Sequence, residues 1–358
     1  MRWEVLAKAS LSKKFNKQLR RGLGEFYIRS VNYPLAFIRM LRLPNLIIVF
    51  LTQYIPYWFA LRPALLKAGG IPLLTEHTFQ LIAAATVLTT LAGYILNDYY
   101  DRHIDAMNKP RRAVWGRVLP PSFALILYAG IVGVAHWLAF LIDQELRPHD
   151  HWPLWLFPGI SFLLFLSAWV FKCTVLMGNM LVSVLCALVP VVMLLPEQRA
   201  IWLTSFIQPE LVHQAVTVVW LYALFAFLSN LLREQIKDLE DFQGDAACGC
   251  FTLAVLKGPR YAKKPAGFTG LILSLFVFVL LIFWSQTGAP KWQIGAGTLL
   301  LFLPALFTTM ILYRAQGKPD FRRASFLVKI VMFAGVFLLL RCWPEDIVGE
   351  AQLYFAKF

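Results

Sequence analysis

A short polar segment of this 358-residue chain carries side chains that could bind a metal ion. Asn97, Asp101 and Asp105 are each four residues apart. Asp98 lies three residues before Asp101. On a helix this spacing places the first three side chains on one face and Asp98 at its flank. Because like charges at this spacing repel one another, the arrangement is costly unless a cation lies beside it.

A second acidic stripe occurs further along the chain. Helical spacing again relates its members, which are Glu234, Asp238, Asp241 and Asp245. Oxygen ligands on two facing elements suit Mg²⁺, which also binds substrate phosphates. The two stripes together therefore predict a Mg²⁺ site. The alternative is a pair of hydrated acidic loops whose charge is balanced by nearby arginine and lysine residues.

The rest of the chain must hold these stripes at the surface of a membrane. Apolar residues make up 59% of the sequence and charged residues only 15%. Soluble domains have roughly 45–50% apolar and about 25% charged residues. The composition excludes an ordinary soluble protein, a disordered chain and a fibrous protein. It indicates an integral, multi-pass membrane protein.

Nine apolar runs are long enough to cross a bilayer core of about 30 Å. They predict an all-α membrane protein with nine transmembrane helices. The predicted spans are 44–62, 79–97, 120–142, 154–171, 175–196, 215–232, 267–287, 294–313 and 325–343. Each acidic stripe follows an even-numbered span, so we expect both stripes on the same side of the membrane as the N-terminus.

Basic residues orient the predicted spans. The side that holds the N-terminus and both stripes carries 26 of the 34 lysines and arginines, whereas the opposite side carries 7. Because basic loops remain in the cytoplasm, we expect the N-terminus and the stripes to be cytoplasmic. The predicted location is the cytoplasmic (inner) membrane of a bacterium. The net charge of +14 reflects this bias and contact with membrane lipids, and we expect no nucleic-acid partner.

The predicted organisation has three parts. Residues 1–43 form a basic, partly amphipathic cytoplasmic segment, 44–343 form the membrane domain, and 344–358 form a short tail. The five cysteines, an odd number, predict no disulfide framework.

The basic residues that follow each stripe would suit a polyanionic substrate. They are Lys109, Arg111, Arg112, Arg117, Lys257, Arg260, Lys263 and Lys264. Metal that bridges phosphate oxygens, with arginine and lysine neutralising the remaining charge, is typical of a diphosphate site. At a membrane surface the natural polyanion is the head group of a lipid diphosphate.

The two stripes resemble the motifs of the UbiA superfamily of intramembrane prenyltransferases. Residues 97–105 match the family pattern NDxxDxxxD in full. Residues 108–112 resemble the NxPxRP that follows it, with Ala113 in place of the final proline. Residues 238–253 resemble the second, DxxxD-type motif and its GDxxxGxxTL continuation. The second motif is most similar to the branch of digeranylgeranylglyceryl phosphate, chlorophyll and homogentisate prenyltransferases.

This resemblance implies a nine-helix bundle around a central cavity and an enzyme that depends on Mg²⁺. The implied reaction moves a polyprenyl group from a prenyl diphosphate to a hydrophobic acceptor, either an aromatic quinone precursor or a glycerol-phosphate lipid, and releases diphosphate. The implied catalytic carboxylates are Asp98, Asp101, Asp241 and Asp245. The implied metal ligands are these four together with Asp105 and Asp238.

Further polar residues are candidates for binding the substrate. They are Arg42, Asn45, Asn97, Arg112, Lys172, Asn179 and Lys237. Polar groups at membrane depth indicate function by default. For Arg42 and Asn45 the alternative is a helix-end anchor and an interhelical hydrogen bond, and Lys172 either reaches the diphosphate or anchors a helix end.

A transporter or channel with cytoplasmic acidic cation sites is the alternative function. It predicts charged residues at mid-depth in several spans. In this sequence the acids gather instead at the inner ends of the second and sixth spans. This distribution favours the enzyme.

Overall fold

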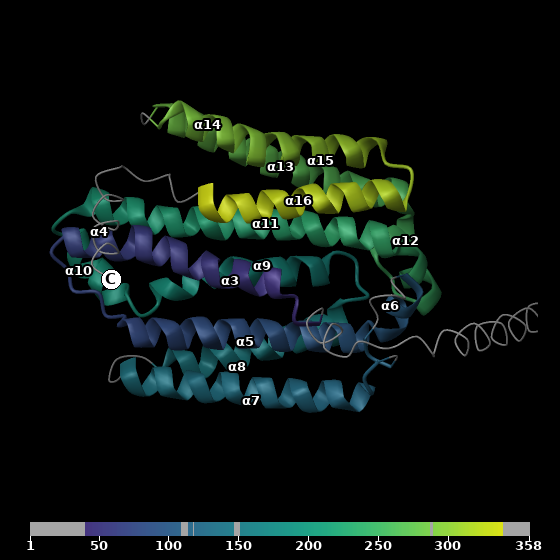
Figure 1. Ribbon diagram of the computed structural model, residues 1–358, viewed down its shortest axis with the longest axis horizontal. Coiled ribbons are helices and arrows are strands. Elements are labelled where there is room, and N and C mark those ends of the chain that lie inside the picture. The colour runs from purple at the N-terminus through teal and green to yellow at the C-terminus, as the bar shows by residue number, and fades with distance from the viewer. Residues whose placement is uncertain (1–39, 109–113, 117, 147–150, 287–288, 339–358) are drawn as a thin grey trace, which may run out of the picture.

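The computed structural model describes residues 40–108, 114–116, 118–146, 151–286 and 289–338. In these ranges the chain folds into helices and has no strand, apart from one isolated bridge between Trp115 and Leu119. The long helices run side by side as a bundle (Figure 1). Most of the predicted segment 1–43, the tail 344–358 and Arg112 lie outside the described residues.

The predicted apolar runs correspond to long helices, three of which contain a short π-helical turn. The elements in chain order are α3 (Leu43–Pro56), η2 (Tyr57–Leu61), α4 (Arg62–Lys67), α5 (Glu76–Tyr100), α6 (Arg102–Asn108), α7 (Pro121–Leu146), α8 (Trp152–Leu166), η3 (Ser167–Phe171), α9 (Met177–Val191), η4 (Val192–Leu194), α10 (Gln198–Ser205), α11 (Pro209–Cys248), α12 (Leu253–Lys257), α13 (Pro259–Gln286), α14 (Lys291–Gly297), η5 (Thr298–Phe302), α15 (Leu303–Arg314) and α16 (Lys318–Leu338).

Eight helical segments within the described residues are long and apolar enough to cross a membrane. The ninth predicted span coincides with α16, which packs against α11 and α15. Helix α16 carries Arg322, Arg323 and Lys329 and is not one of these eight segments. The all-α fold is confirmed, and the count of nine spans stays a prediction.

The bundle consists of two outer groups of helices and a middle layer between them. Helices α5, α7 and α8 pack together on one side, and α11, α13, α15 and α16 pack together on the other. Helices α3 and α9 lie between the two groups (Figure 1). Large buried side chains such as Tyr57, Tyr222 and Trp284 fill the core. Helix α11 packs against α3 and α9 as well as against α13 and α16, so it joins the middle of the bundle to one outer group.

Both acidic motifs lie at one end of the bundle. Helix α11 has 40 residues, a length of about 60 Å at 1.5 Å per residue, so it extends well beyond a bilayer core of about 30 Å. It ends at Gly249, whose φ of 74° suits a residue without a Cβ. Helices α6 and α12, which follow the two motif-bearing helices, lie at this same end (Figure 1).

The odd number of cysteines predicted no disulfide framework, but one disulfide is present. Cys173, in the turn between η3 and α9, is bonded to Cys250, directly after α11. The Cα atoms lie 4.5 Å apart, and the Phe251 N–H donates to the Cys173 carbonyl oxygen at 3.2 Å. The number of cysteines gave no sign of this pair because it depends on two turns meeting across 77 residues.

Candidate active site

The first motif lies on one nearly continuous helical path. Helix α5 ends at Tyr100 and α6 begins at Arg102, and the Asp105 N–H still donates to the Asp101 carbonyl oxygen at 2.8 Å. The Asn97 side-chain amide donates to Asp101 Oδ2 at 3.1 Å. Asn97 and Asp101 thus lie on one helical face, as their spacing predicted.

Basic side chains from two other elements bind the first motif. Arg42, which caps the start of α3, donates to and forms an ion pair with Asp98. Lys172, at the end of η3, forms an ion pair with Asp101 and donates to Asn97 Oδ1 at 3.1 Å. Arg42 and Lys172 thus contact the motif itself, whereas the alternative interpretation assigned them only to anchoring a helix end.

The Arg42 backbone has a left-handed conformation, with φ at 49° and ψ at 43°. This conformation is uncommon outside glycine and is found where the surroundings enforce it, often at functional sites. Here the guanidinium lies over the Tyr94 ring, 5.0 Å from its centroid, while it binds Asp98. The strained turn holds the guanidinium between helices α3 and α5.

Asp101 is the most deeply enclosed carboxylate of the first motif, with 5% of its surface exposed. Burial alone would raise the pKa of this carboxyl because it disfavours the charged form. The charges of Lys172 and Lys237 outweigh burial and lower the pKa of Asp101 below its ordinary value. Asp101 is therefore ionised at neutral pH and can bind a cation.

The second motif lies on the facing side of α11. Asn179 of α9 donates to Asp238 Oδ2 at 2.7 Å. Two basic side chains lie on the same stripe, with Arg233 Nη1 2.6 Å and Lys237 Nζ 3.9 Å from Glu234 carboxylate oxygens. Asn179 and Lys237 thus lie at the second motif, and their role in binding the substrate stays a prediction.

A close contact between α6 and α11 fixes the distance between the two motifs. The Asn108 side-chain amide donates to the Asp241 carbonyl oxygen at 3.0 Å. Lys318 donates to the Asn108 carbonyl oxygen at 3.3 Å. Gly244 lies directly against the Asn108 amide, and a Cβ at this position would collide with it. The glycine of the second motif therefore allows the first motif to approach.

Carboxylates of both motifs line a polar cavity of roughly 60 Å³, which we name the motif chamber. Its polar lining residues are Asn97, Asp101, Ser167, Lys172, Asn179, Glu234, Lys237, Asp238, Asp241, Asp245 and Thr252. Asp98 and Asp105 lie instead in an adjoining polar cavity of roughly 420 Å³, the vestibule. The vestibule is also lined by Arg42, Asn45, Asp101, Arg233, Lys237, Glu240, Ser325 and Lys329.

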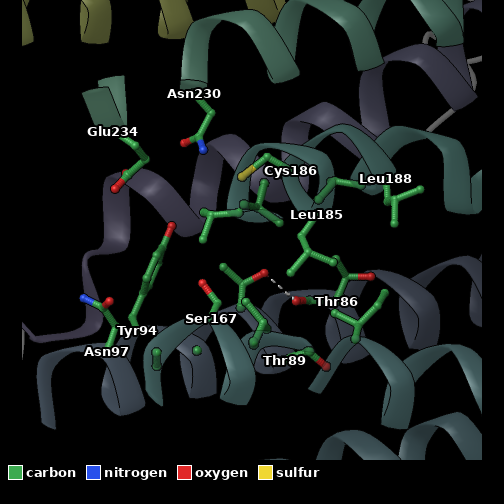
Figure 2. Close-up of a pocket in the computed structure, with 18 of the residues that line it drawn as sticks. Thr86, Thr89, Tyr94, Asn97, Ser167, Leu185, Cys186, Leu188, Asn230 and Glu234 are labelled. Carbon is green, nitrogen blue, oxygen red and sulfur yellow. Dashed lines mark hydrogen bonds between the residues drawn. The ribbon is translucent and has the colours of Figure 1, made fainter. Parts of the chain in front are cut away.

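A third, mostly apolar cavity extends from the motif chamber into the bundle between α5, α8, α9 and α11. We name it the tail pocket, and its volume is roughly 140 Å³. Figure 2 shows Asn97, Tyr94 and Glu234 at one end of it, whereas Leu185 and Leu188 lie toward the other. The tail pocket and the motif chamber share Asn97, Glu234 and Lys237 as lining residues, so the two cavities adjoin.

The donor set of the motif chamber fits magnesium. Its candidate ligands are carboxylate oxygens, which Mg²⁺ prefers over nitrogen and sulfur ligands. Among the described residues, no three His, Cys, Asp or Glu side chains are close enough together to hold a metal ion as they stand. Lys172 and Asn179 bind two of the six predicted ligands, Asp101 and Asp238. The assignment of all six as ligands stays a prediction.

Comparison with known proteins gives the family. A model of the UbiA prenyltransferase family matches residues 54–334. The chain belongs to this family. It is therefore a prenyltransferase and an integral, multi-pass membrane protein, as predicted, and the transporter alternative has no support.

Two archaeal proteins named digeranylgeranylglyceryl phosphate synthase are among the relatives. The one from Methanopyrus kandleri is 34% identical over 72% of this chain and 84% of its own length. The one from Thermococcus kodakarensis is 28% identical over 77% of this chain and 89% of its own length. A solved structure described as a digeranylgeranylglyceryl phosphate synthase in membranes has a TM-score of 0.56 and 18% identity, and covers 87% of this chain and 98% of that one. It shows the same UbiA fold.

Several residues of the site were absent from the predicted set. They are Tyr94, Asn230, Arg233, Glu234 and Lys329, all of which line the cavities. A signal for three of them exists in the sequence. Glu234 already belongs to the second acidic stripe of α11, Asn230 lies four residues before it, and Arg233 lies four residues before Lys237.

Proposed function

We propose that this UbiA-family enzyme transfers a polyprenyl group from a prenyl diphosphate to a hydroxyl group of a glycerol-phosphate lipid, with Mg²⁺ as cofactor. One observation carries the proposal. Carboxylates of both motifs line a single chamber, and this chamber adjoins an apolar pocket inside the bundle. A polar site for a diphosphate thus continues into an apolar site for a hydrocarbon chain.

The residues that would hold Mg²⁺ are the six motif aspartates, with Asp101, Asp238, Asp241 and Asp245 in the chamber itself. When bound, Mg²⁺ supplies positive charge to the phosphate oxygens and so makes diphosphate a better leaving group. Lys172 and Lys237 line the same chamber and are placed to neutralise the remaining oxygens. Asn97 and Asn179 provide hydrogen bonds at its walls.

The basic residues have a second role while no substrate is bound. Arg42 binds Asp98 and Lys172 binds Asp101, so each of these two carboxylates has a compensating positive charge. A diphosphate that enters with its cation offers oxygens to the same arginine and lysine. We infer that these side chains exchange carboxylate partners for phosphate partners when substrate binds.

The reaction itself breaks the allylic C–O bond, and the bonding electrons leave with the diphosphate. The hydroxyl oxygen of the acceptor then bonds to the allylic carbon and loses its proton. Water would capture the same carbon, so the site must exclude it. The tail pocket suits this need because its lining beyond Tyr94 is mainly apolar.

The acceptor class rests on the relatives. Both archaeal relatives are named for the synthesis of digeranylgeranylglyceryl phosphate, a glycerol-phosphate lipid. The charge bias supports an orientation with the N-terminus and both motifs in the cytoplasm. These relatives are archaeal, so the bacterial inner membrane stays a prediction.

The test uses membranes that contain the full chain, radiolabelled geranylgeranyl diphosphate and a panel of acceptors. We expect a labelled ether lipid from geranylgeranylglyceryl phosphate, no product in EDTA, and recovery when Mg²⁺ is added in excess. Product from an aromatic acceptor alone would overturn the acceptor class. Equal turnover with and without EDTA would overturn the role of Mg²⁺.

A further inference from the structure

A second apolar cavity adjoins the tail pocket. Its walls come from α3, α9, α11 and α16, with Tyr94 contributed by α5, and its volume is roughly 220 Å³. We name it the α3–α16 groove. Its lining residues are Pro44, Asn45, Ile48, Val49, Thr52, Tyr94, Cys186, Val189, Tyr222, Phe225, Ala226, Ser229, Asn230, Arg233, Lys329, Met332, Phe333 and Val336.

The groove is charged at the motif end and apolar further into the bundle. On α16 the lining runs from Lys329 through Met332 and Phe333 to Val336, all on one helical face. On α11 it runs in the same direction from Arg233 to Phe225. A cavity with a cationic head region and an apolar continuation fits a lipid with an anionic head group and a hydrocarbon chain.

The charged end of the groove opens into the vestibule. Asn45, Arg233 and Lys329 line both cavities. The vestibule also contains carboxylates, and Asp101 among them pairs with Lys172. Asp98 is bound by Arg42, and Glu240 accepts from Arg322 Nε at 3.3 Å.

The groove and the tail pocket meet near the motifs. Both are lined by Val49, Tyr94, Cys186, Val189, Asn230 and Arg233. None of the second-motif aspartates lines the groove, so the groove lacks the ligands that would hold a metal-bound diphosphate. Its charged lining residues, Arg233 and Lys329, are cationic instead. Two chains lying in the two cavities would therefore bring their head groups together at the motif end.

We propose that the α3–α16 groove binds the acceptor lipid and that Lys329, together with Arg233, holds its phosphate. The inference rests on the proposed function and adds the residues that select the second substrate. Lys329 is a positioning and specificity residue because it places the acceptor hydroxyl beside the allylic carbon. It also explains a lysine within the apolar part of α16, where a charge is costly and usually functional.

The first test replaces Lys329 with Gln and measures KM separately for the two substrates. We expect the KM for geranylgeranylglyceryl phosphate to rise by about tenfold or more, because a charge-assisted hydrogen bond is lost. The KM for the prenyl diphosphate should stay within about twofold, since its phosphates bind in the motif chamber. Lys329→Arg should restore the KM for the acceptor.

The matched control is Arg323→Gln on the same helix. Arg323 is an exposed basic residue that does not line the groove, and its Nη1 lies 4.0 Å from Asp320 Oδ1. Both KM values should remain at the wild-type level. An equal rise of the acceptor KM in Lys329→Gln and Arg323→Gln would show that the effect comes from general surface charge, and this would overturn the proposal.

The second test blocks the apolar part of the groove. Ala226→Phe places a ring inside the cavity, whereas Leu224→Phe places one on the exposed face of the same helix. We expect Ala226→Phe alone to raise the KM for the acceptor. Binding is checked without turnover by the rise in melting temperature that geranylgeranylglyceryl phosphate causes in each variant.

The outcomes separate the two proposals. Wild-type transfer to the phosphorylated lipid with an unchanged acceptor KM in Lys329→Gln and Ala226→Phe overturns the groove assignment and leaves the proposed function intact. A parallel rise of both KM values in Lys329→Gln also overturns it. Failure of the wild type to transfer to any glycerol-phosphate lipid overturns the proposed function and this inference with it.

Discussion

Single side chains at the site show a consistent pairing of acids with partners from distant parts of the chain. Arg42 reaches Asp98 across 56 residues, and Asn179 reaches Asp238 across 59. Each pair neutralises or hydrogen-bonds a carboxylate that the bundle partly buries. The cavity geometry is therefore set by charges that the sequence places far apart.

Local spacing was sufficient to predict some of these contacts and insufficient for others. The contact of Asn97 with Asp101 follows directly from helical periodicity. The role of Arg42 was left open because its partner depends on how α3 packs against α5, and periodicity within one segment carries no such information. The same holds for Lys329, which the sequence shows only as an isolated lysine in an apolar run.

The motif aspartates allow a direct prediction at the residue scale. Asp98→Asn or Asp241→Asn should lower kcat by at least about a hundredfold, because each removes a charge needed to hold the cation and stabilise the leaving group. Turnover of labelled prenyl diphosphate measures the effect.

Glu210→Gln is the matched control for this pair of variants. Glu210 lies in the first turn of α11, at the opposite end from Asp241, and lines none of the cavities described above. This variant should keep wild-type turnover. Full activity in Asp98→Asn or Asp241→Asn would contradict the metal-binding role of that residue.

Packing between elements decides whether the two motifs meet. Helix α6 lies against the end of α11, where Asn108 donates to the Asp241 backbone and Gly244 leaves room for it. The sequence identified both helices from their periodicity but not this contact. The sequence also did not predict the π turns or the Cys173–Cys250 bond, because both depend on tertiary packing.

The contact between α6 and α11 makes Gly244→Ala a sensitive variant. The added methyl group would collide with the Asn108 amide, and such overpacking costs about 1–3 kcal/mol. We expect a lower melting temperature and a larger loss of turnover than stability alone explains, because the first motif is displaced from the second.

Gly267→Ala on α13 provides the comparison. A Cβ at Gly267 meets no other atom within 4 Å, and alanine is favoured over glycine in a helix by about 1 kcal/mol. The melting temperature should stay equal or rise in this variant, with unchanged turnover. A Gly244→Ala protein that matches Gly267→Ala in both measurements would disprove the close-approach argument.

The whole molecule has two chemically different ends. One end carries both motifs, α6 and α12, and the other carries the α4 and α10 connections (Figure 1). The sequence predicted this arrangement from the parity of its spans and from the excess of basic residues on one side. Those signals suffice because membrane thickness and charge bias constrain each helix separately. They do not specify which helices are neighbours, which is why the cavities could not be predicted.

The sidedness of the two ends can be measured by labelling single cysteines with a membrane-impermeant maleimide in a cysteine-free background. His103→Cys and Gln243→Cys report the motif end, and His77→Cys and Ile207→Cys report the other, since all four positions are exposed. We expect the first pair to react only in inside-out vesicles and the second pair only in intact cells. His77 and His103 are 26 residues apart, about 39 Å along a helix, which exceeds the bilayer core. Labelling of His103→Cys and Gln243→Cys from opposite sides would separate the two motifs and rule out a shared diphosphate site, whereas labelling of both from outside would only reverse the orientation.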